Sequence, residues 1–213
     1  MRIWGITDTG LVRRENQDAY ATAVAADCTV AVVCDGMGGT NGGHAASSIA
    51  VDTLLHELQA ALKPAMGWPQ INEAVLHAID QANLAIRARA QEDESLSHMG
   101  TTLVCAVCRD TEAEVFNVGD SRCYLLNETG IRQITRALGP DERVEADSFR
   151  VPWQQGDFLL LCTDGLVNTV TDQEMLFEVM HESDLDGCLD RLMALAKAQG
   201  APDNVTVVLL QNL

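Results

Sequence analysis

Five aspartates in this chain stand where apolar runs begin or end. Four of them adjoin strand-like runs, and the fifth follows a polar stretch, RRENQ; they are Asp35, Asp120, Asp164, Asp203 and, after the polar stretch, Asp18. A single Asp-Gly after a strand is usually only a turn. If the runs are core strands of neighbouring sheets, however, their ends meet, and the five carboxylates then come together at one place.

Carboxylates that converge repel one another, and some of them stay protonated unless cations neutralise them. All-oxygen ligands suit Mg²⁺ or Mn²⁺, whereas Zn²⁺ prefers nitrogen and sulfur. Gly36, directly after Asp35, allows its backbone carbonyl to come close to a cation, and we expect the glycines that follow to turn the chain into a helix. Paired divalent cations generate hydroxide at neutral pH and stabilise a phosphoryl group during in-line displacement.

Other catalytic motifs are not supported by the sequence. Gly119-Asp120-Ser121 is not a GxSxG nucleophile elbow, and the chain contains no Walker A lysine motif. Cys105 and Cys108 have CxxC spacing, but they lie in a strand-like run, where an offset of three places the two thiols on opposite faces. We therefore expect neither a zinc site nor a redox site there.

The composition of the chain excludes several classes of partner. Its 213 residues carry a formal net charge of -17, from 31 Asp and Glu against 14 Lys and Arg, and such a surface repels nucleic acid and anionic membranes. No apolar run approaches the ~20 residues that cross a bilayer, and no signal-peptide region follows Met1. Seven cysteines, mostly in apolar runs, fit a reducing cytoplasm. We expect one cytoplasmic domain spanning residues 1–213.

The periodicity of apolar residues predicts strands and helices in two groups. Strands are expected over 2–7, 19–23, 29–34, 101–107, 113–118, 123–126, 131–134, 158–162 and 205–210, and helices over 44–62, 70–91, 172–182 and 185–199, with a hairpin turn at 127–130. Each group of strands has a helix pair nearby in sequence, which indicates an α+β fold of two sheets with helices outside.

The motifs, taken in chain order, resemble those of the PPM family, the metal-dependent type 2C protein phosphatases, in their small bacterial stand-alone form. The matching stretches are GLVRRENQD at 10–18, DGMGG at 35–39, AS at 46–47, MGTT at 99–102, VGDSR at 118–122, QIT at 133–135, LLCTDG at 160–165 and DNVT at 203–206. The resemblance implies a four-layer αββα sandwich with two mainly antiparallel sheets and a metal cleft between them.

The same resemblance implies a role for each residue. Asp35 bridges two Mg²⁺ or Mn²⁺ ions and the Gly36 carbonyl binds one of them, while Asp18 acts through bound water. Asp164 and Asp203 complete the first metal site, and Asp120 with Asp164 matches a third. Arg13, rather than Arg14, holds the substrate phosphate, since a guanidinium fork matches phosphate oxygens. The implied reaction is attack on phosphorus by metal-bound hydroxide, without a phosphoenzyme.

Two positions depart from the family pattern. Thr40 stands where relatives often have a histidine, and His44 is the nearest histidine, so metal-bound water is an alternative leaving-group acid. In addition, Gln133-Ile134-Thr135 runs directly into Arg136, so the helical flap segment of the family is missing. A natural short form, an engineered deletion or a disordered loop left out of the sequence would each explain this, and the first two would leave the cleft open.

We expect a monomeric phosphatase that acts on phosphoserine and phosphothreonine proteins, the substrates of a cognate Ser/Thr kinase. Two alternatives stay open: a non-catalytic regulatory or binding domain on the same fold, and a phosphatase of small phosphoesters. The five aspartates argue against the first alternative, because a degenerate domain would be expected to lose metal ligands. The second alternative needs the same charge stabilisation at phosphorus, so the sequence does not exclude it.

Overall fold

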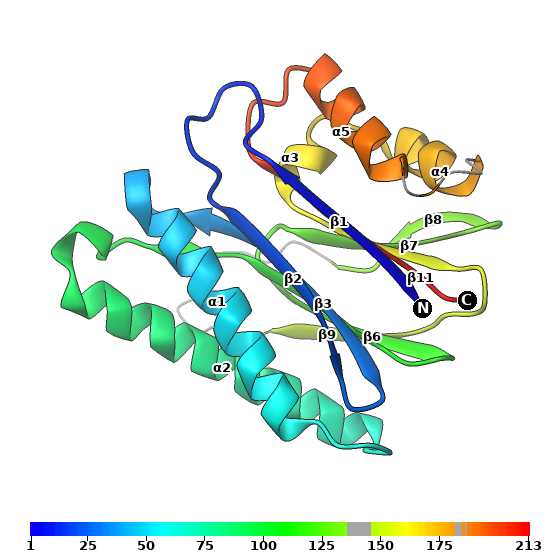
Figure 1. Cartoon of the computed structure of the whole chain (residues 1–213), viewed down its shortest axis with the longest axis horizontal. Coiled ribbons are helices and arrows are strands. Elements are labelled where there is room, and N and C mark those ends of the chain that lie inside the picture. The colour runs from blue at the N-terminus through cyan, green and yellow to red at the C-terminus, as the bar shows by residue number, and fades with distance from the viewer. Residues whose placement is uncertain (136–145, 182–184, 186) are drawn as a thin grey trace.

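The computed structural model describes residues 1–135, 146–181, 185 and 187–213, with only the backbone described for Thr40 and Asn41. Two antiparallel sheets face each other, and helices cover the outer face of each (Figure 1). This arrangement confirms the predicted α+β sandwich of four layers.

The first sheet, called here the β1 sheet, has the strand order β1-β11-β10-β7-β8. Its strands are β1 (Arg2–Asp8), β11 (Val205–Gln211), β10 (Phe158–Cys162), β7 (Arg122–Asn127) and β8 (Gly130–Gln133). Strands β7 and β8 form the predicted hairpin, in which Asn127 pairs with Gly130. The first and last strands of the chain lie side by side, so the two termini are close together (Figure 1).

The second sheet, the β3 sheet, has the strand order β2-β3-β5-β6-β9, with the short β4 paired to the end of β3. Its strands are β2 (Asp18–Ala25), β3 (Cys28–Met37), β5 (Leu103–Cys108), β6 (Glu112–Val118), β9 (Asp147–Pro152) and β4 (Gly100–Thr101). Strand β9 was not anticipated, because its charged and polar residues alternate along an edge where most side chains stay accessible.

Two long helices pack on the β3 sheet, and three shorter ones pack on the β1 sheet (Figure 1). The long pair is α1 (Gly39–Ala61) and α2 (Trp68–Glu92), followed by the short η1 (Glu94–Leu96). The others are α3 (Asp164–Val167), α4 (Asp172–His181) and α5 (Cys188–Ala198). No helix in the described part of the chain is long and apolar enough to cross a membrane.

Alternation along each strand builds three apolar layers. In β3, Val30, Val32 and Cys34 pack against the helices, whereas Ala31 and Val33 pack between the sheets. The same rule separates the two thiols of the CxxC motif: Cys105 faces the helices and Cys108 faces the other sheet, as predicted. Asp35 continues the parity of Ala31 and Val33, so it falls on the inter-sheet side, at the end of the strand.

Helix α1 begins at Gly39, five residues before the predicted start at 44. Gly38 and Gly39 turn the chain with φ values of 129° and 77°, as expected of glycines between a strand and a helix. Gly42 and Gly43, in contrast, lie inside the helix. A Cβ on Gly43 would lie 2.7 Å from the backbone of Gly36, so the glycine permits close packing of helix on strand rather than a turn.

Candidate active site

Two of the predicted aspartates lie opposite each other on neighbouring strands. Asp18 at the start of β2 pairs with Asp35 near the end of β3. The backbone of Asp35 is tied to the β4–β5 segment: its N–H donates to Thr102 Oγ1 at 2.9 Å, and its carbonyl accepts from the Thr102 N–H and from Thr101 Oγ1, both at 2.8 Å. These bonds fix where the Asp35 side chain leaves the sheet.

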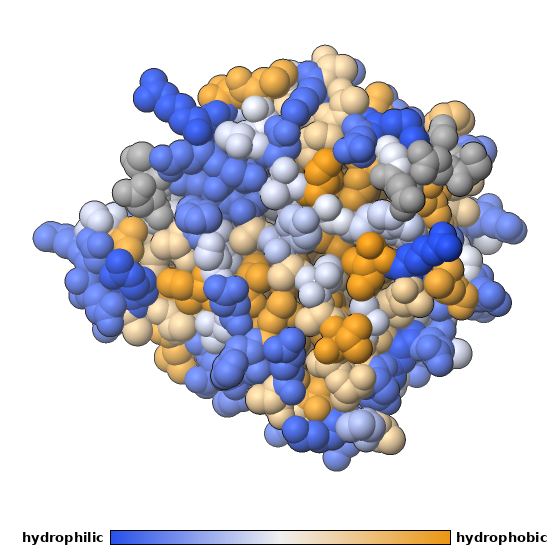
Figure 2. Space-filling model, viewed as in Figure 1, coloured by the Kyte–Doolittle hydropathy of each residue, from blue (hydrophilic) through white to orange (hydrophobic). Residues whose placement is uncertain are grey.

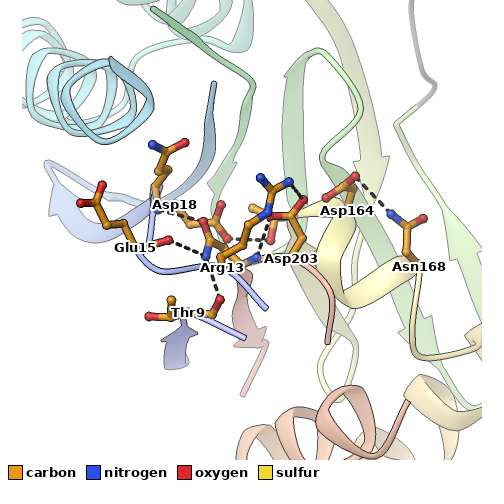
Figure 3. Close-up of polar contacts among 10 residues, drawn as sticks. Thr9, Arg13, Glu15, Asp18, Asp164, Asn168 and Asp203 are labelled. Atoms are coloured by element: carbon orange, nitrogen blue, oxygen red, sulfur yellow. Dashed lines mark hydrogen bonds and ion pairs between the residues drawn. The ribbon is translucent and has the colours of Figure 1, made fainter. Parts of the chain in front are cut away.

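The β1 sheet contributes two aspartates from the facing side. Asp164 is the first residue of α3, two residues after the end of β10, and Asp203 lies two residues before β11. A Cβ on Gly165 would overlap the carbonyl of Asn204, so this glycine lets the two segments that carry the aspartates meet. Asn168 Nδ2 donates to Asp164 Oδ2 at 3.1 Å (Figure 3), and within the described ranges Asp164 Oδ1 is buried without a hydrogen-bond donor.

A cleft of about 620 Å³ opens where these segments meet. Five of the predicted site residues line its walls: Arg13, Asp35, Gly36, Asp120 and Asp203. The other lining residues are Arg14, Glu15, Gln17, Met37, Gly38, Gly39, Thr102 and Asn204. Asp18 and Asp164 are not part of this wall. Asp120 is exposed at the cleft, whereas Asp18 is buried, with 6% of its surface accessible.

Asp18 is held from the opposite sheet. Its Oδ2 accepts hydrogen bonds from Thr163 Oγ1 at 2.9 Å and from Thr206 Oγ1 at 2.7 Å, and its Oδ1 is buried without a hydrogen-bond partner in the described part of the chain. Burial raises the pKa of Asp18 to about 6, although the two hydroxyl groups act in the opposite direction.

Asp35 is the most strongly perturbed carboxyl in the cleft wall. Burial, and then the charge of Asp18 followed by the charges of Asp164, Asp203 and Asp120, raises its pKa to about 8. The pKa of Asp164 is also raised, by burial and then by the charges of Asp120 and Asp203. The fold therefore holds carboxyls close enough together that protons, or cations in their place, are needed to neutralise them.

Asp203 already has a cationic partner. Arg13 Nη2 donates to Asp203 Oδ2 at 2.7 Å, and Asp203 Oδ1 accepts from the Asn204 N–H at 2.9 Å (Figure 3). The hydrogen bond and charge of Asp203 raise the pKa of Arg13. The ion pair is accessible to solvent, with 57% of the Arg13 side chain exposed, so its guanidinium is open to the cleft.

Asn204 fixes the loop that carries Arg13. Its Nδ2 donates to the carbonyls of Thr9 and Glu15, both at 2.9 Å, and its Oδ1 accepts from the Gln17 N–H at 2.9 Å (Figure 3 labels Thr9 and Glu15). The sequence analysis missed this residue, although its position between Asp203 and β11 was a usable signal.

Thr163 and Thr206 were missed as well. Thr163 lies two residues after Leu161 of β10, and Thr206 lies two residues before Val208 of β11. Since Leu161 and Val208 point between the sheets, both threonines fall on that same side. A polar residue at the end of an otherwise apolar inter-sheet face marks the place where the core gives way to the site, and alternation alone would have located it.

The donor set fits a hard divalent cation. It consists of carboxylate oxygens, two of them buried without partners, and of Gly36, whose Cβ would overlap the carbonyl of Gly43. Within the described ranges, however, no three His, Cys, Asp or Glu side chains form a ready-made metal-holding group. At Asp203 the reason is visible: its Oδ2 is bound to Arg13, which a cation would have to displace or share.

The sequence departs from the family pattern at Thr40, where a histidine was expected, and after Thr135, where the flap segment was expected. His44 lines a separate pocket of about 410 Å³ with Glu15, Asn16 and Ala45. The side chain of Thr40 lies outside the described residues. The same holds for residues 136–145, where the sequence departs from the pattern of the family flap.

A model of the protein phosphatase 2C family matches residues 12–206. The chain belongs to this family. It is 33% identical to the serine/threonine phosphatase stp of Listeria welshimeri, with 96% of this chain and 93% of that protein covered. It is 30% identical to the serine/threonine protein phosphatase PstP of Mycobacterium tuberculosis, over 95% of this chain and 43% of that longer protein.

Solved structures of the family share the fold. The serine/threonine phosphatase Stp1 of Staphylococcus aureus matches with a TM-score of 0.88 at 30% identity, covering 98% of this chain and 94% of that one. The Mycobacterium tuberculosis phosphatase PstP/Ppp matches with a TM-score of 0.84 at 29% identity, covering 98% and 97%. The alignment with the Listeria protein spans 236 positions, more than the 213 residues here, so this chain is the shorter one within the aligned region.

Proposed function

We infer that this protein is a metal-dependent protein serine/threonine phosphatase. The family match and the named serine/threonine phosphatases among its relatives support this function. The observation that carries it in the structure is the convergence of Asp35, Asp120 and Asp203 on one cleft, with Asp18 and Asp164 packed behind.

We propose that Asp35 and the Gly36 carbonyl, with Asp164 and Asp203, hold a pair of Mg²⁺ or Mn²⁺ ions. The pKa of about 8 at Asp35 supports this role, because a cation relieves the repulsion that keeps a proton there. Asp18 contributes from behind the cleft. Asp120, exposed and close enough to raise the pKa of Asp164, is our candidate for a third cation together with Asp164.

When bound there, such cations would supply a nucleophilic hydroxide and would neutralise charge on the phosphoryl group. Arg13 binds the phosphate of the substrate, and its five N–H donors allow it to do so while one of them stays on Asp203. Asn204 keeps the Arg13 loop in place. Among the described residues, the basic side chains of the cleft wall are Arg13 and Arg14, beside the acidic Glu15, Asp35, Asp120 and Asp203, so we expect the wall to attract an anionic substrate once cations neutralise its carboxylates.

We propose phosphoserine and phosphothreonine proteins as substrates, including those of a cognate Ser/Thr kinase, and a monomeric enzyme of the cytoplasm. All seven cysteines are free and buried, which fits a reducing compartment. The alternative of a small-phosphoester phosphatase shares the same cleft and chemistry, so it is separated by the substrate assay below.

The test is hydrolysis of a phosphothreonine peptide, a phosphoserine peptide and p-nitrophenyl phosphate, each with Mn²⁺, Mg²⁺ or EDTA. We expect turnover with Mn²⁺ or Mg²⁺ and none in EDTA, with a higher kcat/KM for the peptides than for p-nitrophenyl phosphate. Turnover that survives EDTA would contradict the metal mechanism. Hydrolysis of p-nitrophenyl phosphate without hydrolysis of either peptide would favour a small-phosphoester substrate.

A further inference from the structure

Thr206 on β11 and Thr163, the residue directly after the neighbouring strand β10, form a buried pair in the β1 sheet. Neither has accessible surface. The Thr163 N–H donates to the Thr206 carbonyl at 3.1 Å, and the Thr206 N–H donates to Thr163 Oγ1 at 3.0 Å. The backbone therefore locks both side chains on the inter-sheet side, and their hydroxyl hydrogens remain available for other bonds.

Both hydroxyls reach across to the same oxygen of Asp18. The distances to Asp18 Oδ2 are 2.9 Å from Thr163 Oγ1 and 2.7 Å from Thr206 Oγ1. Because an ionised carboxylate only accepts hydrogen bonds, both threonines donate to it. Thr206 Oγ1 is also 2.7 Å from Thr7 Oγ1, which accepts from Asn16 Nδ2 at 2.7 Å. Since Thr206 gives its hydrogen to Asp18, the chain runs in one direction, from Asn16 through Thr7 and Thr206 to Asp18.

This arrangement distinguishes the two oxygens of Asp18. Oδ2 is occupied by two hydroxyl donors from the opposite sheet, whereas Oδ1 is buried and accepts no hydrogen bond from any residue that the structure describes. An unpartnered carboxylate oxygen inside a protein requires a compensating ligand. Only Oδ1 is left to meet a cation or a water in the coordination shell of a cation.

We propose that Thr163 and Thr206 are positioning residues for cation binding. They hold the Asp18 carboxylate in one orientation and reserve Oδ1 for the metal site. The inference rests on the proposed function, in which Asp18 contributes to that site. It adds that two threonines of the β1 sheet, which do not contact the cation, determine how tightly Asp18 of the β3 sheet helps to bind it.

The experiment compares Thr163→Val and Thr206→Val, which keep side-chain shape and remove the hydroxyl, with Thr163→Ser and Thr206→Ser, which keep the hydroxyl. Thr135→Val is the matched control, because Thr135 is buried and its hydroxyl bonds the Cys123 N–H away from the cleft. Mn²⁺ binding is measured by calorimetry on the full chain, together with the Mn²⁺ dependence of phosphopeptide hydrolysis and the melting temperature in EDTA.

We expect each valine variant to weaken, by about tenfold, the Mn²⁺ binding to which Asp18 contributes, the typical effect of losing a hydrogen bond to a charged group. Saturating Mn²⁺ should then restore kcat to within about threefold by the same reasoning, because the affinity changes and the chemistry does not. The serine variants and Thr135→Val should bind Mn²⁺ as the wild type does.

Wild-type Mn²⁺ affinity in both valine variants would overturn this inference and leave the proposed function standing. Serine variants as weak as the valine variants would also overturn it, because packing of the methyl group would then be the cause. Equal weakening by Thr135→Val would assign the effect to lost stability. A wild-type chain that binds no Mn²⁺ would contradict the proposed function itself, and this inference with it.

Discussion

Asp35 is the carboxyl whose charge the fold tolerates least, since burial and four neighbouring aspartates raise its pKa to about 8. Asp18 and Asp203, in contrast, each have partners that stabilise the charged form, two hydroxyls for the first and Arg13 for the second. At the scale of single residues, the site is therefore a set of carboxylates whose central member, Asp35, forms no salt bridge with a basic side chain of the described residues, and a metal ion is the group that would neutralise its charge.

Replacing Asp35 by asparagine should separate stability from activity. Asp35→Asn removes the repulsion, so in EDTA at pH 8 we expect the melting temperature to rise by a few degrees, the scale of a change of about 1 kcal/mol in a chain of this size. The same variant should lose at least about a hundredfold in Mn²⁺-dependent kcat/KM, since it removes a charge that holds the cation. Calorimetric melting measures the expected rise in melting temperature, and phosphopeptide kinetics measure the expected loss of kcat/KM. Full turnover in the variant would rule out the role of Asp35 as the residue that bridges the two cations.

Arg13 and a cation compete for Asp203 Oδ2. Removing Arg13 should therefore weaken the binding of the substrate phosphate and strengthen the binding of the cation. We expect Arg13→Ala to raise KM for a phosphopeptide by about tenfold or more, because a charge-assisted contact to phosphate is lost. Mn²⁺ binding should become tighter. Arg14→Ala is the matched control, because Arg14 also lines the cleft. Equal effects of the two substitutions on KM would mean that net cleft charge, and not the Arg13 position, binds the phosphate.

Among single residues, the sequence predicted the acidic site residues better than the polar residues that hold the site in place by hydrogen bonds. Strand-end placement alone predicted that the aspartates would meet, and five of the predicted residues line one cleft. Thr163, Thr206 and Asn204 escaped because each looks like an ordinary residue of its segment. Their roles depend on which atom faces them across the two sheets, and that register is not encoded locally.

Among the elements, the junction of β3 with α1 governs the position of Asp35 and Gly36. Gly36 and Gly43 are in such close contact that neither has room for a Cβ. The sequence predicted most strands and the two long helices, since their apolar periodicity is continuous. It missed the first turn of α1 because glycines are poor helix formers, and tertiary packing outweighed that preference.

Gly43→Ala should therefore destabilise the protein, although helix propensity alone predicts that alanine stabilises a helix. Alanine normally stabilises a helix interior by about 1 kcal/mol relative to glycine, but here the methyl group would overlap Gly36 and Gln17. We expect a loss of roughly 2 kcal/mol or more in the free energy of unfolding, together with weaker Mn²⁺ binding, because strand and helix are forced apart. Urea unfolding measures the first effect and calorimetry the second.

The control for this element is Gly67→Ala. Gly67 precedes α2 with a φ of -71°, and a Cβ there would meet no atom closer than 3.7 Å. We expect it to change stability by less than about 1 kcal/mol, the size of a changed N-cap. A Gly43→Ala variant as stable as Gly67→Ala would show that the β3–α1 contact is not restrictive.

Over the whole molecule, two apolar sheets pack together through most of their length and become polar only at the site. Figure 2 shows hydrophilic side chains interspersed with apolar ones on the face that it displays. The fold class and the pairing of each sheet with its helices followed from the order of strands and helices. Strand β9 did not, since an edge strand with mixed polarity lacks the buried-face pattern.

The metal-free chain should lose stability as pH rises. The folded-state pKa values of Asp18, about 6, and Asp35, about 8, both lie above the ordinary aspartate value of 3.8, so between pH 5.5 and 8 the folded state binds more protons than the unfolded state. Stability then falls with increasing pH across that window. Melting in EDTA at pH 5.5 and pH 8 should show the decrease, and Mn²⁺ should abolish it. A melting temperature that rises over this range in EDTA would contradict the account.

The central claim is that the strand-end aspartates hold the cations. Anomalous diffraction from a crystal grown with Mn²⁺ tests it directly, because manganese is located without reference to activity. The account predicts at least two peaks in the cleft, each within about 2.6 Å of protein oxygens, with Asp35 bound to both and Gly36, Asp164 and Asp203 completing their coordination. Manganese bound elsewhere, with Asp35 and Asp203 uncoordinated in an enzyme that still hydrolyses phosphopeptide, would contradict it.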